Sequence, residues 1–396
     1  MKHGWDYKKL GELVQVLNGY AFKSSLYENQ GIRVLRITNV QKGNIVDDDP
    51  KYYPLSLTDE IRNYLLKEND LLMSLTGNVG RVGLLTKEML PAALNQRVAC
   101  LRILSNGLNL GFLFHYLNSD KFEQDAVLSA KGIAQKNMST EWLKDYKLPL
   151  PPISVQQTIV SELDKINELI RLKKEQLGDY EKLAQSLFYE MFGDPVENEK
   201  GWEVKKLGEE YKVSSSKRIM QDEWTTEGVP FLKVSDVVSK INGQNSKPST
   251  FISETTYSKL VDSNAVPVQN DILITSRGTL GLCYIVKNED RFYFQDGMIT
   301  WLAECKGNIT PLFLTYLFKN HHFLQQITSK ANKSTVAYIS ISQISKRKIP
   351  LPPLSLQNLF AQRIELIEQQ KAEIKSTIAD LETLLASRMQ YWFFGF

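Results

Sequence analysis

The sequence predicts an α+β protein in which two duplicated domains are separated by two long antiparallel coiled-coil helices, with the halves related by a pseudo-twofold axis. The chain repeats itself at a period of about 200 residues, which is too long for a solenoid and suits a duplicated domain. Each copy has short β-rich runs followed by helices, and each ends in a long, narrow apolar series. We expect domains over residues 1–151 and 194–352, and spacer helices over 152–193 and 353–396.

The repeat consists of five segments that recur in the same order at offsets of 197 to 201. The first pair is GWDYKKLGE (Gly4–Glu12) and GWEVKKLGE (Gly201–Glu209), identical at seven of nine positions. The other pairs are VLRITNV (34–40) with FLKVSDV (231–237), NDLLMSLTGNVG (69–80) with NDILITSRGTLG (270–281), LNQ (94–96) with YFQ (293–295), and KLPLPPISVQQ (147–157) with KIPLPPLSLQN (348–358). The residues between these segments match poorly, so the frame of the unit is shared and its interior has diverged.

Inside the first copy, β-rich runs at 34–37, 70–75 and 100–104 are separated by turns that contain glycine and asparagine. Helical patterns follow at Gly111–Asn118 and Lys121–Ala130. The LPLPP segment then predicts an extended strand, because residues before proline avoid the helical region.

The apolar series after each LPLPP segment predicts a coiled coil. Residues spaced by three and four positions over four heptads are apolar at eight of nine places in the first series and at seven of nine in the second. Some 37 residues at 1.5 Å each make a rod of about 55 Å. Ser154 with Gln157 reads as a capping box at the start of the first helix, and Gly193 and Gly395 read as the ends. The alternative is a helix packed on its own domain. The predicted seam residues are Leu163, Ile166, Ile170, Leu177, Tyr180, Leu187, Ile364, Ile367, Ile374, Ile378, Leu381 and Leu385.

Connectivity predicts how the helices pair. The first helix leads from the first domain to the second, so a second helix that pairs with it must run back. The pair is then antiparallel, and the C-terminal YWFFGF returns to the N-terminal domain.

Composition favours a cytoplasmic protein with a polyanionic partner. The start of the chain has no apolar signal region, and no window approaches the ~18 consecutive apolar residues of a membrane span. The three cysteines are far apart in sequence, which fits a reducing compartment. Residues 1–151 carry 19 Lys/Arg against 16 Asp/Glu (+3) and residues 201–353 carry 19 against 14 (+5), while residues 152–200 carry 6 against 10 (−4). Two basic modules held apart suit a divided site on double-stranded DNA.

The segments W-x-x-x-x-LGE, ND-[LI]-L-x-[ST]-x-x-G-x-x-G and LPLPP-x-S (IPLPP-x-S in the second copy), each present twice and followed by a long helix, resemble the specificity subunit of type I restriction–modification systems over essentially the whole chain. The resemblance implies two target-recognition domains that each read half of an asymmetric bipartite site. It also implies two methyltransferase (M) subunits and the restriction/translocase (R) subunits as partners. S-adenosylmethionine, ATP and Mg²⁺ would bind those partners, and this chain would have no cofactor and no catalytic or metal site. Gln156-Gln157 and Gln357-Asn358 depart from the Glu-Gln that the family often has after the prolines.

Candidate DNA contacts come from the glycine turns and from one segment before each proline run (130–139 and 329–340) that is rich in small, polar and basic residues. Glycine permits close backbone approach, arginine can bind guanine or phosphate, and glutamine can bind adenine. Each candidate has a structural alternative: an ordinary hairpin turn, a solvated charge, or a side chain that fixes a loop. The candidates are Arg36, Thr38, Thr76, Asn78, Arg81, Gln96, Arg97, Lys136, Asn137, Lys233, Ser235, Arg277, Thr279, Gln295, Lys330, Asn332 and Lys333.

Missing motifs weigh against an enzyme. The sequence has no GxxxxGK[ST] phosphate loop, and both Pro-Pro pairs follow leucine, so no Asn/Asp-Pro-Pro-aromatic run is present. Other readings remain open: a silent allele of the same subunit, a nuclease or methyltransferase that acts alone, or a coiled-coil bridging protein with two heads that bind no nucleic acid.

Overall fold

The computed structural model describes residues 5–130, 136–244, 247–328 and 338–395. The chain divides into two compact units, residues 1–174 with 376–396 and residues 175–375, so each unit contains one globular module and half of each long helix. This division cuts across the helices, whereas the sequence suggested separate domains and spacers.

The first unit is built on a four-stranded antiparallel sheet in the order β2-β10-β7-β8. A three-stranded sheet, β6-β3-β9, and two ribbons, β1-β11 and β4-β5, complete it. The strands are β1 (Asp6–Lys9), β2 (Val14–Asn18), β3 (Ile32–Leu35), β4 (Val40–Gln41), β5 (Asn44–Ile45), β6 (Tyr52–Tyr53), β7 (Leu71–Ser74), β8 (Val82–Leu84), β9 (Ala92–Leu94), β10 (Val98–Ile103) and β11 (Lys147–Leu150).

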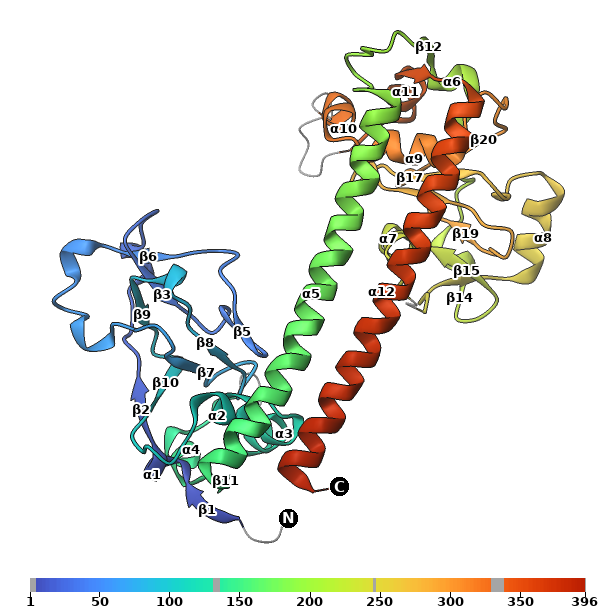
Figure 1. The fold of residues 1–396 in the computed structure, drawn as a ribbon. Helices are drawn as coiled ribbons and strands as arrows, with labels where there is room; N and C mark the ends of the chain where they lie inside the picture. Colours follow the sequence, from blue (N-terminus) through green and yellow to red (C-terminus); the bar gives the residue numbers. More distant parts are fainter. Residues whose placement is uncertain (1–4, 131–135, 245–246, 329–337, 396) are drawn as a thin grey trace. The chain divides into compact units, whose positions relative to one another are not determined.

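Helices cover one face of the main sheet, and Figure 1 shows α2 and α3 beside β7, β8 and β10. Phe112 and Phe122 from these helices are buried against Leu71 and Met73 of β7, which makes one apolar core. The helices are α1 (Leu10–Leu13), α2 (Leu110–Leu117), α3 (Asp120–Ser129), α4 (Thr140–Asp145) and α5 (Ile153–Phe192).

The second unit repeats this plan, with a main sheet in the order β13-β20-β17-β18, a second sheet β14-β16-β15-β19 and the ribbon β12-β21. Its strands are β12 (Glu203–Lys206), β13 (Lys212–Ser214), β14 (Trp224–Thr225), β15 (Val229–Leu232), β16 (Phe251–Ile252), β17 (Ile272–Thr275), β18 (Cys283–Ile285), β19 (Tyr293–Phe294), β20 (Ile299–Ala303) and β21 (Lys348–Leu351). Its helices are α6 (Leu207–Glu210), α7 (Val234–Ile241), α8 (Glu254–Asp262), α9 (Pro311–Lys319), α10 (His321–Thr328), α11 (Ile341–Ser345) and α12 (Leu354–Phe394). The α+β prediction is therefore confirmed.

The repeated ND segment is a structural turn. Asn69 and Asn270 have positive φ, at 65° and 71°, which asparagine tolerates better than most residues. In the second module the Asp271 carboxylate accepts the backbone N–H of Val268 at 2.9 Å, and in the first module the Asp70 carboxylate accepts that of Lys67 at 2.8 Å. These two residues therefore shape the entry into β7 and β17.

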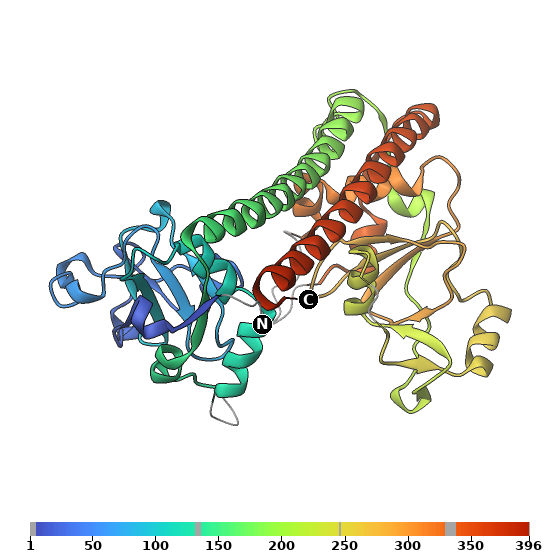
Figure 2. The same ribbon diagram turned by 60° about the horizontal axis from the view of Figure 1, so that its bottom comes forward.

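The long helices α5 and α12 pack together and are antiparallel, as predicted. In the first unit, Glu162 pairs with Arg388 and Lys174 with Glu382, so the residue numbers fall on one helix as they rise on the other. Both views show the C-terminal end of α12 beside the first module (Figures 1 and 2), and Phe393 packs there against Phe112.

All twelve predicted seam residues are shielded from solvent to some degree. Seven are buried (Leu163, Ile166, Ile170, Ile364, Ile367, Ile374 and Ile378), and the other five are half-buried. Lys371 interrupts the seam at 5% exposure. Burial opposes its charge, but hydrogen bonds to Glu181 and Glu368 raise the pKa of Lys371, so the cation stays inside the helix pair.

The predicted capping box is wrong. Helix α5 already begins at Ile153, so Ser154 lies in its first turn, and Gln157 is exposed. The preceding glutamine fixes the helix start instead: the buried Gln156 amide donates to the carbonyls of Gly107 and Pro151, both at 2.8 Å, and its oxygen accepts the N–H of Asn109 at 2.8 Å. Gln357 makes the same three bonds in the second module, to Asn308, Pro352 and Thr310.

Candidate nucleic-acid interface

The first glycine turn is a hairpin loop between the antiparallel strands β7 and β8. Gly80 donates its backbone N–H to Ser74 at 2.9 Å, which closes the loop and leaves Gly77 and Asn78 exposed at its tip. Gly77 and Gly80 both have positive φ, and a Cβ on Gly80 would lie 2.7 Å from that of Ala126 on α3. Glycine is therefore required here so that the loop can turn and still rest on α3.

The loop is fixed by a segment more than 50 residues further along the chain. Met138 donates its N–H to Leu75 at 2.8 Å, Gly77 donates to Lys136 at 3.1 Å, and the Thr76 hydroxyl donates to the Asn137 side chain at 2.8 Å. Leu75 in turn donates to the carbonyl of Arg97 at 3.0 Å. Five sequence-predicted candidates, namely Thr76, Asn78, Arg97, Lys136 and Asn137, are therefore brought together around one loop.

The second module repeats this arrangement at an offset of 201 residues. Ser276 donates to the carbonyl of Met298 at 2.9 Å, and Ile339 donates to Ser276 at 2.9 Å. An isolated β-bridge joins Arg277 to Tyr338, as another joins Thr76 to Asn137. The two modules thus share a backbone frame that presents different side chains.

Those side chains differ at every compared position. The first module has Thr76, Asn78, Arg97 and Asn137 where the second has Arg277, Thr279, Met298 and Tyr338. Met298 and Tyr338 were missed because neither is a basic, amide or small hydroxyl residue, the types that were chosen as candidates. Their offset of 201 from Arg97 and Asn137 was the signal that could have found them.

Several predicted contacts already have partners within the module. Arg36 donates to the carbonyl of Asp49 at 2.5 Å and pairs with its carboxylate at 3.4 Å. Arg81 donates to the Gln41 side chain at 2.9 Å, and Lys233 lies over the Trp224 ring at 4.9 Å. These three side chains stabilise the module's own structure, whereas Arg97 and Arg277 are exposed.

The pairing of Gln96 with Gln295 is wrong by one residue. Parallel register places Leu35 opposite Leu94 and Leu232 opposite Phe294, so Gln295 occupies the place of Asn95. The backbone N–H groups agree, since Asn95 donates to Leu35 at 3.2 Å and Gln295 donates to Leu232 at 2.9 Å. The three-residue sequence match was too short to detect this shift.

The remaining candidates are divided between exposed positions and undescribed ones. Thr38, Ser235 and Gln96 are exposed, and Gln295 is half-buried. Lys330, Asn332 and Lys333 lie outside the described residues.

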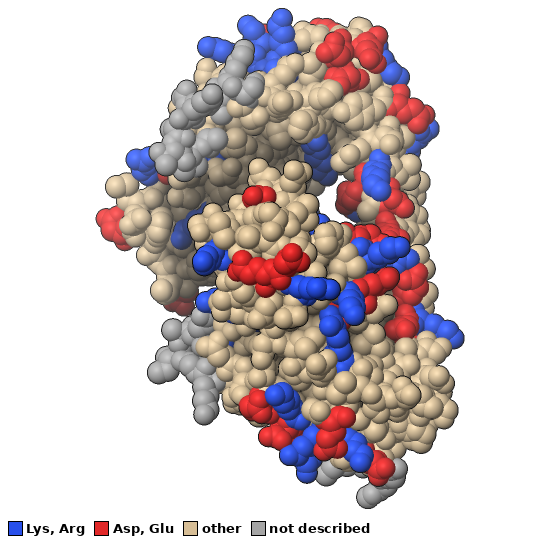
Figure 3. Space-filling model, turned by 90° about the vertical axis from the view of Figure 1, so that its left-hand side faces the viewer, with Lys and Arg blue, Asp and Glu red and all other residues tan. Residues whose placement is uncertain are grey.

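Charge is mixed over much of the surface. In the face shown in Figure 3, lysine and arginine side chains lie among aspartate and glutamate side chains over most of the view. A basic group is gathered at the top of that view. Any attraction of a polyanion must therefore come from local clusters of charge.

No group of three or more His, Cys, Asp or Glu side chains that could hold a metal ion occurs in the described part of the chain. Asp194, which with Glu203 and Lys205 loosely imitates a nuclease pattern, accepts the backbone N–H of Val196 at 2.7 Å and contacts the His322 ring at 3.1 Å. No helix among the described ranges is long and apolar enough to span a bilayer.

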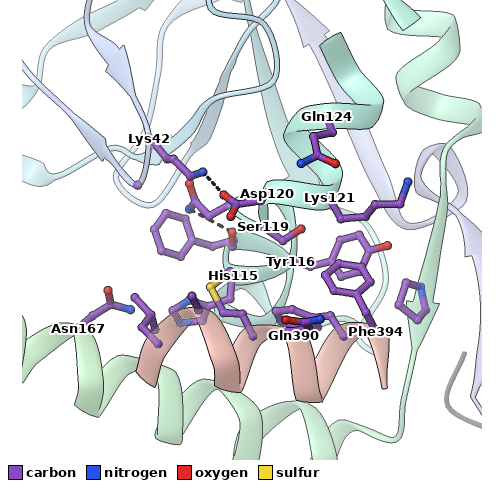
Figure 4. A pocket seen from close by; sticks show the side chains of 18 of the residues that line it. Lys42, His115, Tyr116, Ser119, Asp120, Lys121, Gln124, Asn167, Gln390 and Phe394 are labelled. Carbon is purple, nitrogen blue, oxygen red and sulfur yellow. Dashed lines mark hydrogen bonds and ion pairs between the residues drawn. The ribbon is translucent and has the colours of Figure 1, made fainter. Parts of the chain in front are cut away.

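A hollow of about 900 Å³ lies between α2, α3 and the end of α12 in the first unit. Figure 4 shows the aromatic rings of Tyr116 and Phe394 beside it and Lys42 bonded to Asp120 at 2.5 Å. The buried His115 contacts Asp164 of α5 at 2.7 Å across its wall. This hollow reflects how the end of α12 rests on the module.

Comparison with known proteins places this duplicated fold in one class. The model of the type I restriction modification DNA specificity domain matches residues 2–179 and again residues 199–382. Because the two matches cover most of the chain, the protein belongs to this family. The resemblance inferred from sequence motifs is thereby confirmed.

Individual relatives vary in how much they share. The EcoAI specificity subunit of Escherichia coli is 32% identical over 170 residues, which are 42% of this chain and only 29% of that protein. The EcoBI specificity subunit of Escherichia coli is 21% identical over 99% of this chain and 86% of its own length. A chain from a solved structure on complex assembly and conformational transition of the type I R-M system matches 99% of this chain and 98% of its own, with 19% identity and a TM-score of 0.62, which shows the fold.

Proposed function

We propose that this chain is the DNA-sequence-recognition subunit of a type I restriction–modification complex, that it reads an asymmetric bipartite site, and that it has no catalytic activity of its own. The observation that carries the proposal is the duplicated loop: one backbone frame presents Thr76, Arg97 and Asn137 in the first module and Arg277, Met298 and Tyr338 in the second. Equivalent frames dock on DNA in the same manner, while unlike side chains select unlike bases.

The helices α5 and α12 act as the spacer between the half-sites in this proposal. Helix α5 has 40 residues, which is about 60 Å at 1.5 Å per residue. The Lys371 pairs and the apolar seam stabilise the helix pair, so that the number of unread base pairs is constant.

The outer faces of these helices suit the M and R subunits as partners. Six leucines on α5 and α12 are at least 42% exposed, and clusters of exposed apolar side chains mark protein-binding surfaces: Leu169, Leu172, Leu183, Leu359, Leu366 and Leu384. S-adenosylmethionine, ATP and Mg²⁺ would be bound by those partners, in the cytoplasm.

Exchange of residues 13–146 for the corresponding segment of another specificity subunit tests modular reading. Methylation-sensitive genome sequencing, with the modification partner present, should report a change in one half-site and no change in the other. A change in both halves would contradict the proposal.

Addition or removal of whole helical turns within Val155–Met191, with matching changes in α12, tests the spacer role. The same sequencing should then find both half-sites unchanged and the gap between them altered. An unaltered gap would show that the helices do not set the spacing.

A further inference from the structure

The second unit contains a hollow of about 720 Å³ between α10, α11, β21 and the segment that follows α5. Three successive cations, Lys346, Arg347 and Lys348, line it. They lie where α11 ends and β21 begins. In Figure 3, basic side chains gather at the top of the view, the level at which α11 and β12 lie in Figure 1.

These cations are poorly compensated inside the protein. The Arg347 guanidinium lies over the Phe323 ring at 4.6 Å and donates through Nη2 to Gln326, but its buried Nε has no hydrogen-bond partner. Burial lowers the pKa of Arg347, as expected for a cation without a counter-ion. Neither Lys346 nor Lys348, both exposed, is paired with a carboxylate of the described residues.

The equivalent region of the first module has different side chains. Tyr146 takes the place of Arg347, since Leu10 donates to Tyr146 and Leu207 donates to Arg347, both at 2.8 Å. Trp142 packs on Tyr146 with ring centroids 5.3 Å apart, and the offset of 201 residues gives Gln343 in its place. An aromatic pair therefore lies where the second module has Gln343 and Arg347.

The region also differs in net charge between the two modules. In the first module, Asp145-Tyr146-Lys147 carries −1, 0 and +1, a sum of zero, whereas Lys346-Arg347-Lys348 carries a sum of +3. The Asp145 carboxylate forms an ion pair with Lys9 at 2.7 Å. The equivalent residues of the second module, Lys346 and Lys206, are both cations and cannot form this pair. The second module therefore has neither the aromatic pair nor the internal counter-ion of the first.

We propose that the hollow binds phosphate groups of the DNA backbone, which gives the second module a sequence-independent grip that the first module lacks. The Nε–H group of Arg347 can donate a hydrogen bond to a phosphate oxygen. The flanking Lys346 and Lys348 supply positive charge without base selectivity. The inference rests on the proposed function.

The hollow is within reach of a duplex that contacts the second glycine loop. Tyr338 bridges to Arg277 on that loop, and α11, five residues long, spans about 7.5 Å from there towards Lys346. Each strand of B-DNA presents a phosphate about every 3.4 Å along the axis, so one backbone can pass both places. This proximity favours DNA over an acidic protein segment as the occupant.

The test compares the full-length wild type with the variant Lys346→Gln/Arg347→Gln/Lys348→Gln. Affinity is measured between 0.05 and ~0.3 M salt for a duplex that carries the recognition motif and for one that lacks it. Loss of three phosphate contacts should reduce the slope of log K against log salt by about 2–3 and weaken binding on the order of 100-fold at ~0.1 M salt. The ratio of motif to non-motif affinity should not change.

Two controls keep the result interpretable. The variant Lys259→Gln/Lys287→Gln/Lys306→Gln removes three exposed cations of the same unit outside the hollow and should leave the slope within about one of the wild type. The variant Lys346→Gln/Lys348→Gln changes exposed residues only. It should retain the wild-type melting temperature and show about two-thirds of the slope change of the triple variant.

Each contrary outcome has a distinct meaning. An equal loss in the control variant, or an unchanged slope in the hollow variants while the wild type still prefers its motif, overturns the phosphate site and leaves the proposed function intact. Retained DNA binding with lost assembly onto the methyltransferase subunit would identify an acidic protein segment as the occupant and also overturn it. If the wild type shows no preference for its motif, the proposed function is refuted. The difference in salt slope between the wild type and the hollow variants then tests the phosphate site alone.

Discussion

The carboxylate of Glu162 on α5 accepts hydrogen bonds from the guanidinium of Arg388 on α12, with Nη2 at 3.1 Å. The Trp392 indole donates to the same carboxylate at 2.8 Å. Glu162 therefore ties the last turns of the chain to the first turns of α5, and Arg388 lowers the pKa of its carboxyl group.

A double-mutant cycle on Glu162→Gln and Arg388→Gln should give a coupling free energy of about 1 kcal/mol, because both side chains are about one-third exposed and screened by water. The folded-state pKa of Glu162 is depressed, so this stabilisation is complete above the unfolded value of about 4.5 and is lost as the pH falls through the lower folded value. Urea denaturation at pH 7 and pH 3 measures both effects. A coupling free energy as large at pH 3 as at pH 7 would contradict this account.

Gln156→Ala should lower the free energy of unfolding by about 3 kcal/mol, because it leaves the N–H of Asn109 and the carbonyls of Gly107 and Pro151 without their buried partner. The neighbouring exposed Gln157→Ala should change it by less than about 0.5 kcal/mol. Chemical denaturation of both variants provides the comparison. Equal effects would show that the buried amide does not fix the helix start.

Gly178→Ala should stabilise the protein by about 0.5–1 kcal/mol, because Gly178 is an exposed residue inside α5 and an added Cβ meets nothing within 4 Å. Gly80→Ala should destabilise it, since φ is +84° and the new Cβ would lie 2.7 Å from Ala126. Thermal melting of the two variants should give shifts of opposite sign.

Asp70→Asn should destabilise the first module by about 2–3 kcal/mol at pH 7, because Asp70 accepts two hydrogen bonds from Arg102, at 2.8 and 2.6 Å. Its counterpart Asp271 has Ala303 opposite in place of an arginine, and burial raises the pKa of Asp271. A raised pKa means that the folded protein binds the Asp271 proton more tightly than the unfolded chain does. The Asp271 carboxyl group therefore adds stability as the pH falls through its folded-state pKa, and it lowers stability when it is ionised above that pKa.

Asp271→Asn should therefore be neutral or stabilising at pH 7, where the amide oxygen can still accept the Trp301 indole N–H. The variant should also lose the part of the wild type's pH dependence above about pH 4 that comes from ionisation of the buried Asp271 carboxyl group. Denaturation at pH 5 and pH 7 would detect this. Strong destabilisation by Asp271→Asn at pH 7 would show that the charged carboxylate is needed.

Arg97→Met, which gives the first loop the residue of the second, should weaken motif binding by about 1–3 kcal/mol if the guanidinium binds a base edge, and should relax selectivity in one half-site only. Arg81→Met, at an arginine already bonded to Gln41, is the matched control and should affect stability more than selectivity. Competition binding with single-base variants of the motif distinguishes the two effects.

The sequence by itself determined the duplication, the α+β class of each module and the antiparallel seam. The duplication is visible as repeated segments in the same order, and the module class and the seam follow from periodic patterns of apolar residues and from connectivity. It also located the glycine loops, since glycine at Gly80 and Gly281 is required by positive φ.

Only the tertiary structure decided which residues meet. The bonds of Thr76 to Asn137 and of Gln156 to Gly107 join segments about 50 to 60 residues apart, and no local pattern records them. Strand register showed that Gln295 corresponds to Asn95 of the first module. The cationic hollow at Arg347 became visible by comparison with the Trp142–Tyr146 contact at the equivalent place in the first module. Such contacts depend on the shape and chemistry of both surfaces at once, which a single stretch of sequence does not contain.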